Sequence, residues 1–375
     1  MKILYFSPIM WDDLKQRPQH LAEELAKVHK IYYIEPTVSI VNSLLNGNEL
    51  YKPRSIKIND NLTVLRPNGK FRLPTSLFFI DFFKLNERYI NKQINKLIDD
   101  CDVIWLGSPI YYSLIKDRYD KKIVYDKMDD FTVLTNNLFM KEFINRNESH
   151  LIKQAAIIFT TTKTFYESIK MINNHTYIIH NGVCNNFEIV SNSNNSKVIE
   201  DIKKLQCEGK KIFGYVGTID HWFDFEVIKH IVNFDKNYHV FIVGKNNLPE
   251  INNPNIHYYK PVLKEELLLI ISYFDYCLYP FKADNFADTI DPVKIYEYLS
   301  LNKKVISVYT KETERFKDYI NFYSNHSELI NLLANLREIK KPFNNKTLLE
   351  DFINKNCWSE RAKTINNLLK NMIVN

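Results

Sequence analysis

The chain has 375 residues, of which 45% are hydrophobic and 14% aromatic. This length exceeds the size at which one hydrophobic core usually stops growing, so we expect two domains. Lys and Arg outnumber Asp and Glu by 50 to 44, a net charge of +6 that is spread along the chain. That distribution favours an anionic small molecule or an anionic membrane surface over a dedicated nucleic-acid groove.

The cysteines and the N-terminus narrow the class of protein further. Five cysteines lie far apart, and no CxxC or Cys/His spacing suits zinc, so we interpret them as reduced thiols of a cytosolic protein. The start, MKILYFSPIMWDD, lacks the basic leader and cleavage site of a signal peptide and predicts a first strand. No window reaches the roughly 18 apolar residues needed to cross a bilayer. We therefore expect a soluble or peripheral protein.

Short apolar runs alternate with helical patterns, which predicts parallel strands joined by helical crossovers. Predicted strands of the first half occupy residues 2–7, 31–36, 62–67, 102–107, 122–127, 156–161 and 176–181, with helical patterns at 17–28 and 85–100 between them. Those of the second half occupy residues 211–217, 239–244, 255–259, 276–281 and 304–309.

A polar stretch, EIVSNSNNSK at 188–197, separates the two sets of strands and is typical of a linker. We therefore predict an α/β fold of two Rossmann-like, doubly wound domains that face a central cleft, with ligands bound beyond the carboxyl ends of the strands. The predicted domains span residues 1–188 and 189–358, and a C-terminal helix of about 359–375 is expected to pack back on the first domain.

The segment TIDPVKIYEYLSLNKKVIS, residues 289–307, carries the sharpest signal. Asp291 suits an N-cap and Pro292 the first helical position, so a helix should begin there with exposed N–H groups that suit a phosphate. Lys294 and Glu297 are three residues apart and share one face of that helix. Lys294 could meet a diphosphate, and Glu297 could accept hydrogen bonds from a ribose diol. The alternative is a surface Lys–Glu pair on an amphipathic helix.

This segment resembles the donor-binding helix of the GT-B glycosyltransferases, especially the retaining family 4, in which this helix has a sequence similar to PLKLFEYLAAGKPVVS. KIFGYVGTIDHWFDFEVI resembles the first strand and loop of that family's C-terminal domain, IIHNGV the strand that closes its N-terminal domain, and CWSERAKTINNLL its C-terminal helix. MWDDLKQRPQHLAEELAK is similar to the first loop and helix of a bacterial cell-surface polysaccharide subgroup that includes teichuronic-acid-type transferases.

The resemblance implies a GT-B fold, with an acceptor-binding N-terminal domain and a C-terminal domain that binds a nucleotide sugar. It implies that Glu297 holds the ribose and that Lys294, with the backbone of Asp291, Pro292 and Val293, lies near the diphosphate. The loop beneath the diphosphate would be formed by Gly217, Thr218, Asp220, His221 and Trp222.

The chain departs from the family's pattern at two places. Thr289 stands where the family commonly has a second Glu that contacts the donor sugar. The glycine loop offers Asp220, His221 and Trp222 in place of the usual Arg and Lys. Lys245 or Lys282 could supply the missing positive charge.

Two groups in the N-terminal half are candidates for catalysis. Arg17 and His20, in RPQHLAEEL, could hold a donor phosphate or the acceptor; the alternative is a solvated first turn with a core-facing His. In YDKMDDF, which follows a predicted strand, Asp129 or Asp130 could orient the acceptor hydroxyl or take its proton, as could Asp126. N-capping of the next helix is the alternative role for these aspartates.

Residues 70–96 combine phenylalanines with flanking Lys and Arg, a pattern that fits shallow insertion into an anionic leaflet. A buried core helix bordered by solvated charges is the alternative. If the membrane is contacted, we expect the protein at the inner face of the cytoplasmic membrane and a lipid-linked acceptor.

The resemblance implies a transferase that moves a hexose from a nucleotide-diphosphate sugar, with UDP favoured, to a growing cell-surface polysaccharide or its lipid-linked precursor. The family usually needs no metal, and we expect no cofactor. A sugar-nucleotide epimerase of the same architecture and a glycan-binding relative without turnover are the alternatives. A nicotinamide dehydrogenase is disfavoured because no GxGxxG follows any predicted strand.

Overall fold

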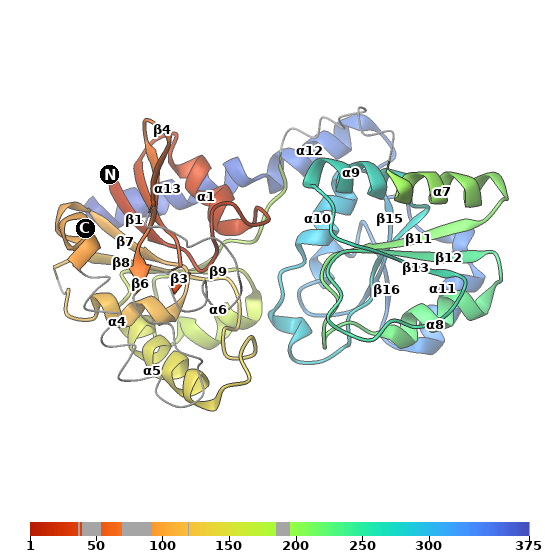
Figure 1. Ribbon diagram of the computed structural model, residues 1–375, viewed down its shortest axis with the longest axis horizontal. Coiled ribbons are helices and arrows are strands. Elements are labelled where there is room, and N and C mark those ends of the chain that lie inside the picture. The colour runs from red at the N-terminus through yellow and green to blue at the C-terminus, as the bar shows by residue number, and fades with distance from the viewer. Residues whose placement is uncertain (37, 40–53, 70–91, 119, 185–195, 375) are drawn as a thin grey trace. The chain divides into compact units, whose positions relative to one another are not determined.

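The computed structural model describes residues 1–36, 38–39, 54–69, 92–118, 120–184 and 196–374 (Figure 1). The chain divides into two compact units. Unit 1 comprises Met1–His180 and Arg361–Asn375, and unit 2 comprises Asn181–Glu360.

Unit 1 is built on an eight-stranded sheet with the order β10-β9-β8-β7-β1-β2-β5-β4. Its strands are β1 (Lys2–Phe6), β2 (Lys30–Ile34), β4 (Arg54–Asn59), β5 (Leu62–Arg66), β7 (Val103–Leu106), β8 (Lys122–Lys127), β9 (Ile157–Thr160) and β10 (Thr176–Ile178), and β3 (Val38–Ser39) pairs with β6 (Asn68–Gly69) apart from them. Its helices include α1 (Arg17–Leu25), α4 (Tyr112–Ile115), α5 (Leu138–Gln154), α6 (Lys163–Lys170) and most of α13 (Trp358–Val374). Neighbouring strands of the large sheet are parallel except β4, which runs antiparallel to β5.

All seven strands predicted for the first half are confirmed. The two-residue strands β3 and β6 were missed, and so was the longer strand β4. Residues 55–60, at the edge of the sheet, are largely exposed, so this strand has no continuous apolar run to mark it. In the centre of the sheet the ring of Tyr5 stacks on Tyr33 at 5.6 Å and on Trp105 at 5.1 Å. Trp105 therefore packs in the core of unit 1.

Unit 2 is a six-stranded, all-parallel sheet with the order β13-β12-β11-β14-β15-β16. Its strands are β11 (Lys211–Val216), β12 (Tyr238–Val243), β13 (Ile256–Tyr259), β14 (Tyr276–Tyr279), β15 (Lys304–Val308) and β16 (Asn321–Tyr323). Its α-helices are α7 (Lys197–Cys207), α8 (Phe225–Phe234), α9 (Lys264–Tyr273), α10 (Val293–Ser300), α11 (His326–Ala334) and α12 (Lys346–Asn356). In chain order this is the 3-2-1-4-5-6 arrangement of a dinucleotide-binding Rossmann sheet.

Helices cover both faces of this sheet. Helices α7 and α9 contact one another on one face, and α8 and α11 contact one another on the opposite face (Figure 1). Because both faces are covered, the central strands are buried along most of their length and read as unbroken apolar runs. All five strands predicted for the second half are confirmed.

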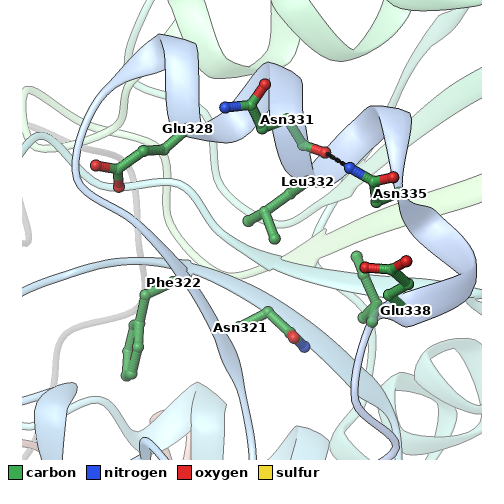
Figure 2. A pocket seen from close by; sticks show the side chains of 8 residues that line it. Asn321, Phe322, Glu328, Asn331, Leu332, Asn335 and Glu338 are labelled. Carbon is green, nitrogen blue, oxygen red and sulfur yellow. Dashed lines mark hydrogen bonds between the residues drawn. The ribbon is translucent and has the colours of Figure 1, made fainter.

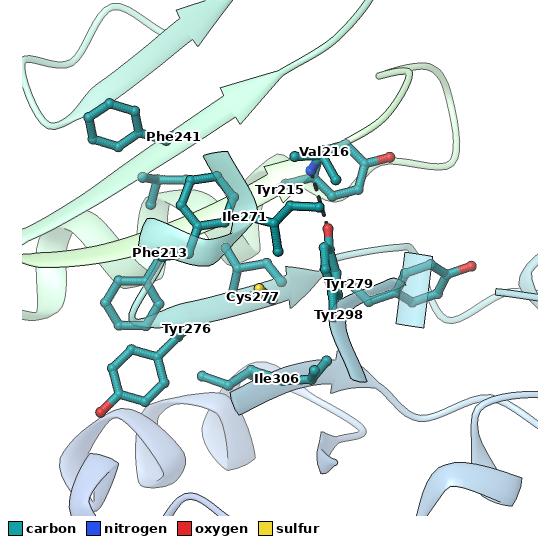
Figure 3. Close-up of a cluster of buried hydrophobic side chains, with 14 of the residues drawn as sticks. Phe213, Tyr215, Val216, Phe241, Ile271, Tyr276, Cys277, Tyr279, Tyr298 and Ile306 are labelled. Carbon is teal, nitrogen blue, oxygen red and sulfur yellow. Dashed lines mark hydrogen bonds between the residues drawn. The ribbon is translucent and has the colours of Figure 1, made fainter. Parts of the chain in front are cut away.

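The core of unit 2 is rich in aromatic rings (Figure 3). Phe213 of β11 stacks on Tyr276 of β14 with ring centroids 5.0 Å apart. The next residue, Gly214, has no room for a side chain, because the ring of Phe274 fills that space. A Cβ added to Gly214 would lie 2.0 Å from Cδ2 of that ring. Close packing of this kind holds β11 against the end of helix α9.

Candidate functional site

The strand order of unit 2 reverses between β11 and β14, which are neighbours in the sheet but not in the chain. In doubly wound sheets, ligands bind beyond the carboxyl ends of the strands at such a point. Because all six strands are parallel, the segments that follow β11, β12 and β14 meet at the same edge. Every residue predicted for donor binding lies in these segments or within α10.

Two glycines shape the backbone at this edge. Gly217 follows β11 with φ 150°, and Gly244 follows β12 with φ 153°, a region that residues with a side chain rarely adopt. A Cβ added to Gly244 would lie 2.0 Å from the carbonyl oxygen of Gly217, and one added to Gly217 would lie 2.7 Å from the Tyr215 hydroxyl oxygen. The two chain segments therefore pass each other with bare backbone, which a ligand can approach closely.

The loop after β11 is tied to the loop after β12 through the Asp220 carboxylate. Asp220 Oδ2 accepts a hydrogen bond from Asn247 Nδ2 at 2.7 Å, and Oδ1 accepts one from the backbone N–H of His221 at 2.7 Å. The bond from Asn247, followed by that from His221, holds the pKa of Asp220 below its usual range. A carboxylate engaged in this way orders the loop; it would repel a phosphate rather than bind one.

An aromatic group lies beside this loop. The ring centroid of His221 is 4.9 Å from Trp222 and 5.3 Å from Phe286, and Trp222 lies 5.7 Å from Phe286. Lys282 donates from Nζ to the carbonyl oxygen of His221 at 2.7 Å. This bond places a second ammonium group, besides that of Lys245, in the segments that meet at this edge.

Helix α10 begins one residue later than predicted. Pro292 is its N-cap and no side chain caps its first turn, so the predicted N-cap, Asp291, is wrong. The Asp291 carboxylate is buried and accepts hydrogen bonds from the backbone N–H of Asn181 and from Arg315. These two partners turn the side chain inward, away from the helix amides that it was expected to cap.

Lys294 and Glu297 lie on one flank of α10, as their spacing predicts. Lys294 Nζ is 2.8 Å from Glu297 Oε2, so the ion pair named as the alternative is present. The Glu297 side chain is only 12% exposed and that of Lys294 is 23% exposed, much less than a solvated surface pair would be. A nearly buried carboxylate on a helix that starts at this edge is suited to hydrogen bonding with a ligand.

The remaining predicted residues of this edge serve the local backbone. The exposed Lys245 follows Gly244, and its carbonyl oxygen accepts a hydrogen bond from Ile219 N at 2.8 Å. The Thr289 hydroxyl donates to the carbonyl oxygen of Phe286 at 2.7 Å within a short 3-10 turn. Thr218 contributes its carbonyl oxygen, which accepts from the Tyr215 hydroxyl at 3.0 Å.

In unit 1, Arg17 is the first residue of α1, and its side chain is only 4% exposed. It pairs with Asp126 at the end of β8, with Nη2 2.8 Å from Oδ1, and donates from Nη1 to the carbonyl oxygen of Ile179 at 2.8 Å. His20 is buried, as the alternative of a core-facing His predicts, but the solvated first turn of that alternative is wrong, because Arg17, Pro18 and Gln19 are buried too. The structure therefore shows Arg17 holding parts of unit 1 together, and a role for it or for His20 in ligand binding remains a prediction.

The two aspartates after β8 differ in their surroundings. Asp130 Oδ1 accepts hydrogen bonds from the backbone N–H of Thr132 at 3.0 Å and from its hydroxyl at 2.6 Å, which closes a turn. Asp129 is exposed. The next α-helix, α5, is capped by the side chain of Asn137, so the N-capping alternative for these aspartates is wrong.

Three residues that contribute to the geometry of this edge were missed. Tyr298 of α10 accepts a hydrogen bond from Val216 N at 3.2 Å (Figure 3), and Asn181 and Arg315 hold Asp291. Asn181 lies in the IIHNGV motif, so a signal for it existed. The segment around Arg315 has no motif that marks it.

Part of the predicted membrane-contact stretch, residues 70–91, lies outside the described residues, and residues 92–100 are helical. Within the described ranges, no helix is long and apolar enough to cross a membrane. In the same part of the chain, no three or more His, Cys, Asp or Glu side chains are grouped so that they could hold a metal ion.

No protein-family model matches the chain, and no curated protein matches it in sequence. Solved structures of GT-B glycosyltransferases match it over almost its full length, and the chain has their GT-B fold.

Three of these structures illustrate the match. A trehalose-6-phosphate synthase from E. coli bound with UDP-2-fluoro glucose has a TM-score of 0.70 at 11% identity, with 98% of this chain and 99% of that chain covered. Alr3699/HepE of Anabaena in complex with UDP and glucose has a TM-score of 0.62 at 12% identity, with 100% and 99% covered. A UDP-forming α,α-trehalose-phosphate synthase from Burkholderia xenovorans in complex with glucose-6-phosphate has a TM-score of 0.65 at 9% identity, with 99% of each chain covered.

Proposed function

We propose that this protein is a glycosyltransferase that moves a hexose from a UDP-sugar, with retention, to a growing cell-surface polysaccharide or its lipid-linked precursor. The observation that carries the proposal is the nearly buried Lys294–Glu297 pair on a helix that starts at the carboxyl edge of the unit 2 sheet, where Gly217 and Gly244 leave the backbone bare. The shared fold adds support, because solved structures of this fold are described as complexes with UDP.

In this proposal, Lys294 and Glu297 exchange their ion pair with each other for contacts with the bound nucleotide. Lys294 turns from Glu297 to the diphosphate, beside the backbone of Asp291 to Val293. Glu297, as a carboxylate with no proton to donate, accepts hydrogen bonds from the ribose hydroxyls. His221 and Trp222 of the glycine loop form an aromatic group with Phe286. In this proposal the group packs against the donor.

Catalysis then rests on positioning and charge. The bond between the anomeric carbon and the diphosphate oxygen breaks, and its electron pair leaves with the diphosphate. The acceptor hydroxyl forms the new bond to that carbon, and its proton passes to the Asp129 carboxylate or to the departing diphosphate. Lys294 and Lys282 would stabilise the charge that develops on the diphosphate. We propose that no metal or other cofactor takes part.

The acceptor is assigned to unit 1. Asp129, the exposed carboxylate after β8, is the proposed group for orienting or deprotonating the acceptor hydroxyl, with Asp130 ordering the turn beside it. For residues 70–96 we propose contact with an anionic membrane, which would place the enzyme at the inner face of the cytoplasmic membrane. Flotation with anionic liposomes tests this contact, since the double variant Phe78→Ser/Phe82→Ser should float less than the wild type.

A donor screen tests the proposed reaction. Each of several UDP- and GDP-sugars is incubated with the protein, with and without glycan and lipid-linked acceptors and with and without a chelator, and nucleotide release is measured. We expect UDP release that depends on the acceptor and does not respond to the chelator. Conversion of a donor without acceptor would indicate an epimerase, and glycan binding without any turnover would indicate an inactive relative; either result contradicts the proposal.

A further inference from the structure

Unit 2 buries two carboxylates, one just before α10 and one after the following strand, β15. Asp291, just before the helix, has a side chain with no exposure, and Glu312, in the segment after β15, has a side chain that is 2% exposed. Removing a carboxylate from water is costly unless a partner compensates its charge. A positive group must therefore stand with them for unit 2 to fold in this form.

Arg315 provides that charge for both. Its Nη2 donates to Asp291 Oδ1, and its Nη1 donates to Glu312 Oε2 at 2.7 Å. Burial is the largest single effect and by itself would lower the pKa of the Arg315 guanidinium, but Asp291, Tyr296 and Glu312 together outweigh it, so the pKa lies above its ordinary value. The guanidinium therefore stays positively charged.

The same guanidinium packs on aromatic rings from two elements. Its Cζ lies 5.6 Å from the ring centroid of Tyr296, within α10, and 4.7 Å from that of Phe316. The Asp291 carboxylate also accepts a hydrogen bond from the backbone N–H of Asn181. The backbone carbonyl oxygen of Asp291 accepts one from Asn181 Nδ2 at 3.3 Å. The backbone just before α10 is thus held through its side chain and through its carbonyl group.

We propose that Arg315 is a positioning residue that sets the backbone of Asp291 to Val293, and with it the first turn of α10, for a nucleotide diphosphate. This role rests on the proposed function. The first turn has no side-chain cap of its own, so the Asp291–Arg315–Glu312 network supplies the order that a cap would otherwise give. A planar fork with two separate donor nitrogens can hold two carboxylates at once, whereas the single ammonium of a lysine cannot hold both in the same geometry.

The variant Arg315→Lys tests the role, because it keeps the positive charge beside the two buried carboxylates and so favours folding. Calorimetry with UDP, and with uridine by competition, measures both affinities for the wild type and the variant. We expect the UDP affinity to fall about tenfold to a hundredfold, as small misplacements of binding groups do, and the uridine affinity to stay the same. The difference arises because the diphosphate, and not the nucleoside, contacts the backbone that Arg315 sets.

The variant Leu333→Ala is the matched control. Leu333 is a buried residue of α11, so its truncation destabilises unit 2 without touching the Arg315 network. Its UDP affinity should remain that of the wild type. Loss of UDP and uridine affinity by equal factors in Arg315→Lys, or the same UDP loss in Leu333→Ala, would show a merely structural role and overturn the inference.

Failure of the two proposals can be told apart. If the wild type binds UDP and Arg315→Lys binds it equally well, the positioning role is wrong and the proposed function stands. If the wild type binds no nucleotide diphosphate, the proposed function is wrong, and the role of Arg315 falls with it.

Discussion

The hydroxyl oxygen of Tyr298 on α10 accepts a hydrogen bond from the backbone N–H of Val216, the last residue of β11, at 3.2 Å. Both groups are buried, and Val216 directly precedes Gly217. This bond ties the helix that carries Lys294 and Glu297 to the strand that carries the glycine loop. The two parts of the proposed donor site are therefore linked inside unit 2.

Replacing Tyr298 with Phe should destabilise unit 2, because it leaves the buried N–H of Val216 without its acceptor. We expect the free energy of unfolding, measured by urea denaturation, to fall by about 1–3 kcal/mol. Tyr323→Phe is the control: among the described residues the buried Tyr323 hydroxyl has no hydrogen-bond partner, so its removal should cost little. Equal losses in the two variants would show that the bond to Val216 is not the cause.

The variant Glu297→Ala should weaken UDP binding at least about tenfold, since a charged hydrogen-bond acceptor for the ribose is lost. Isothermal titration calorimetry measures the effect. Glu226→Ala removes the carboxylate of an exposed Lys–Glu pair of the same spacing, Glu226 with Lys229 on α8, and should leave UDP binding unchanged. Wild-type affinity in Glu297→Ala would contradict the assignment of this carboxylate to the nucleotide.

Alanine at position 244 should prevent unit 2 from folding in its present form, because the new Cβ would lie 2.0 Å from the backbone carbonyl oxygen of Gly217. Thermal denaturation followed by circular dichroism should show a melting temperature far below that of the wild type, or no cooperative transition. Gly209→Ala is the control, since Gly209 also has a positive φ of 77° but has nothing within 4 Å of an added Cβ. It should cost only about 1–2 kcal/mol. A Gly244→Ala protein as stable as Gly209→Ala would show that the close approach of the two loops is absent in solution.

Two histidines in neighbouring strands of unit 2 should make its stability depend on pH. His239 Nδ1 and His257 Nε2 lie 3.0 Å apart, and the pKa of each is lowered, chiefly by burial. Lowered histidine pKa values mean that the unfolded chain takes up protons first. The contribution of the pair to stability should therefore be complete above a pH of about 6.5, the ordinary histidine pKa. It should fall as the pH drops below that value and level off below the lowered pKa values of the two histidines in the folded protein.

The slope of stability against pH tests this pair. The wild type should lose up to about 1.4 kcal/mol per pH unit for each histidine that stays neutral in the fold. In His257→Phe the slope over the same range should be clearly smaller, while an exposed histidine variant such as His221→Gln should keep the wild-type slope. An unchanged slope in His257→Phe would show that the pair does not carry the effect.

The strands and the spacing within α10 could be predicted from the amino-acid sequence, because they depend on local patterns. Buried parallel strands need unbroken apolar runs, and every predicted run became a strand. Among the strands that were missed, β4 and β16 lie at the edges of the two large sheets and have no such run. The other two, β3 and β6, have only two residues each. Lys294 and Glu297 share a flank of α10 because residues three apart on any helix do so.

The roles of the charged residues were decided by tertiary structure. Asp291 has the local pattern of an N-cap, but Arg315, 24 residues further along the chain, draws its carboxylate inward. From its position at the start of a helix, Arg17 was predicted to bind a phosphate or the acceptor. In the structure, Asp126, 109 residues away, holds it in the interior of unit 1. A buried charge must find a partner wherever the fold brings one within reach, and that partner is set by how strands and helices pack rather than by neighbours in the sequence.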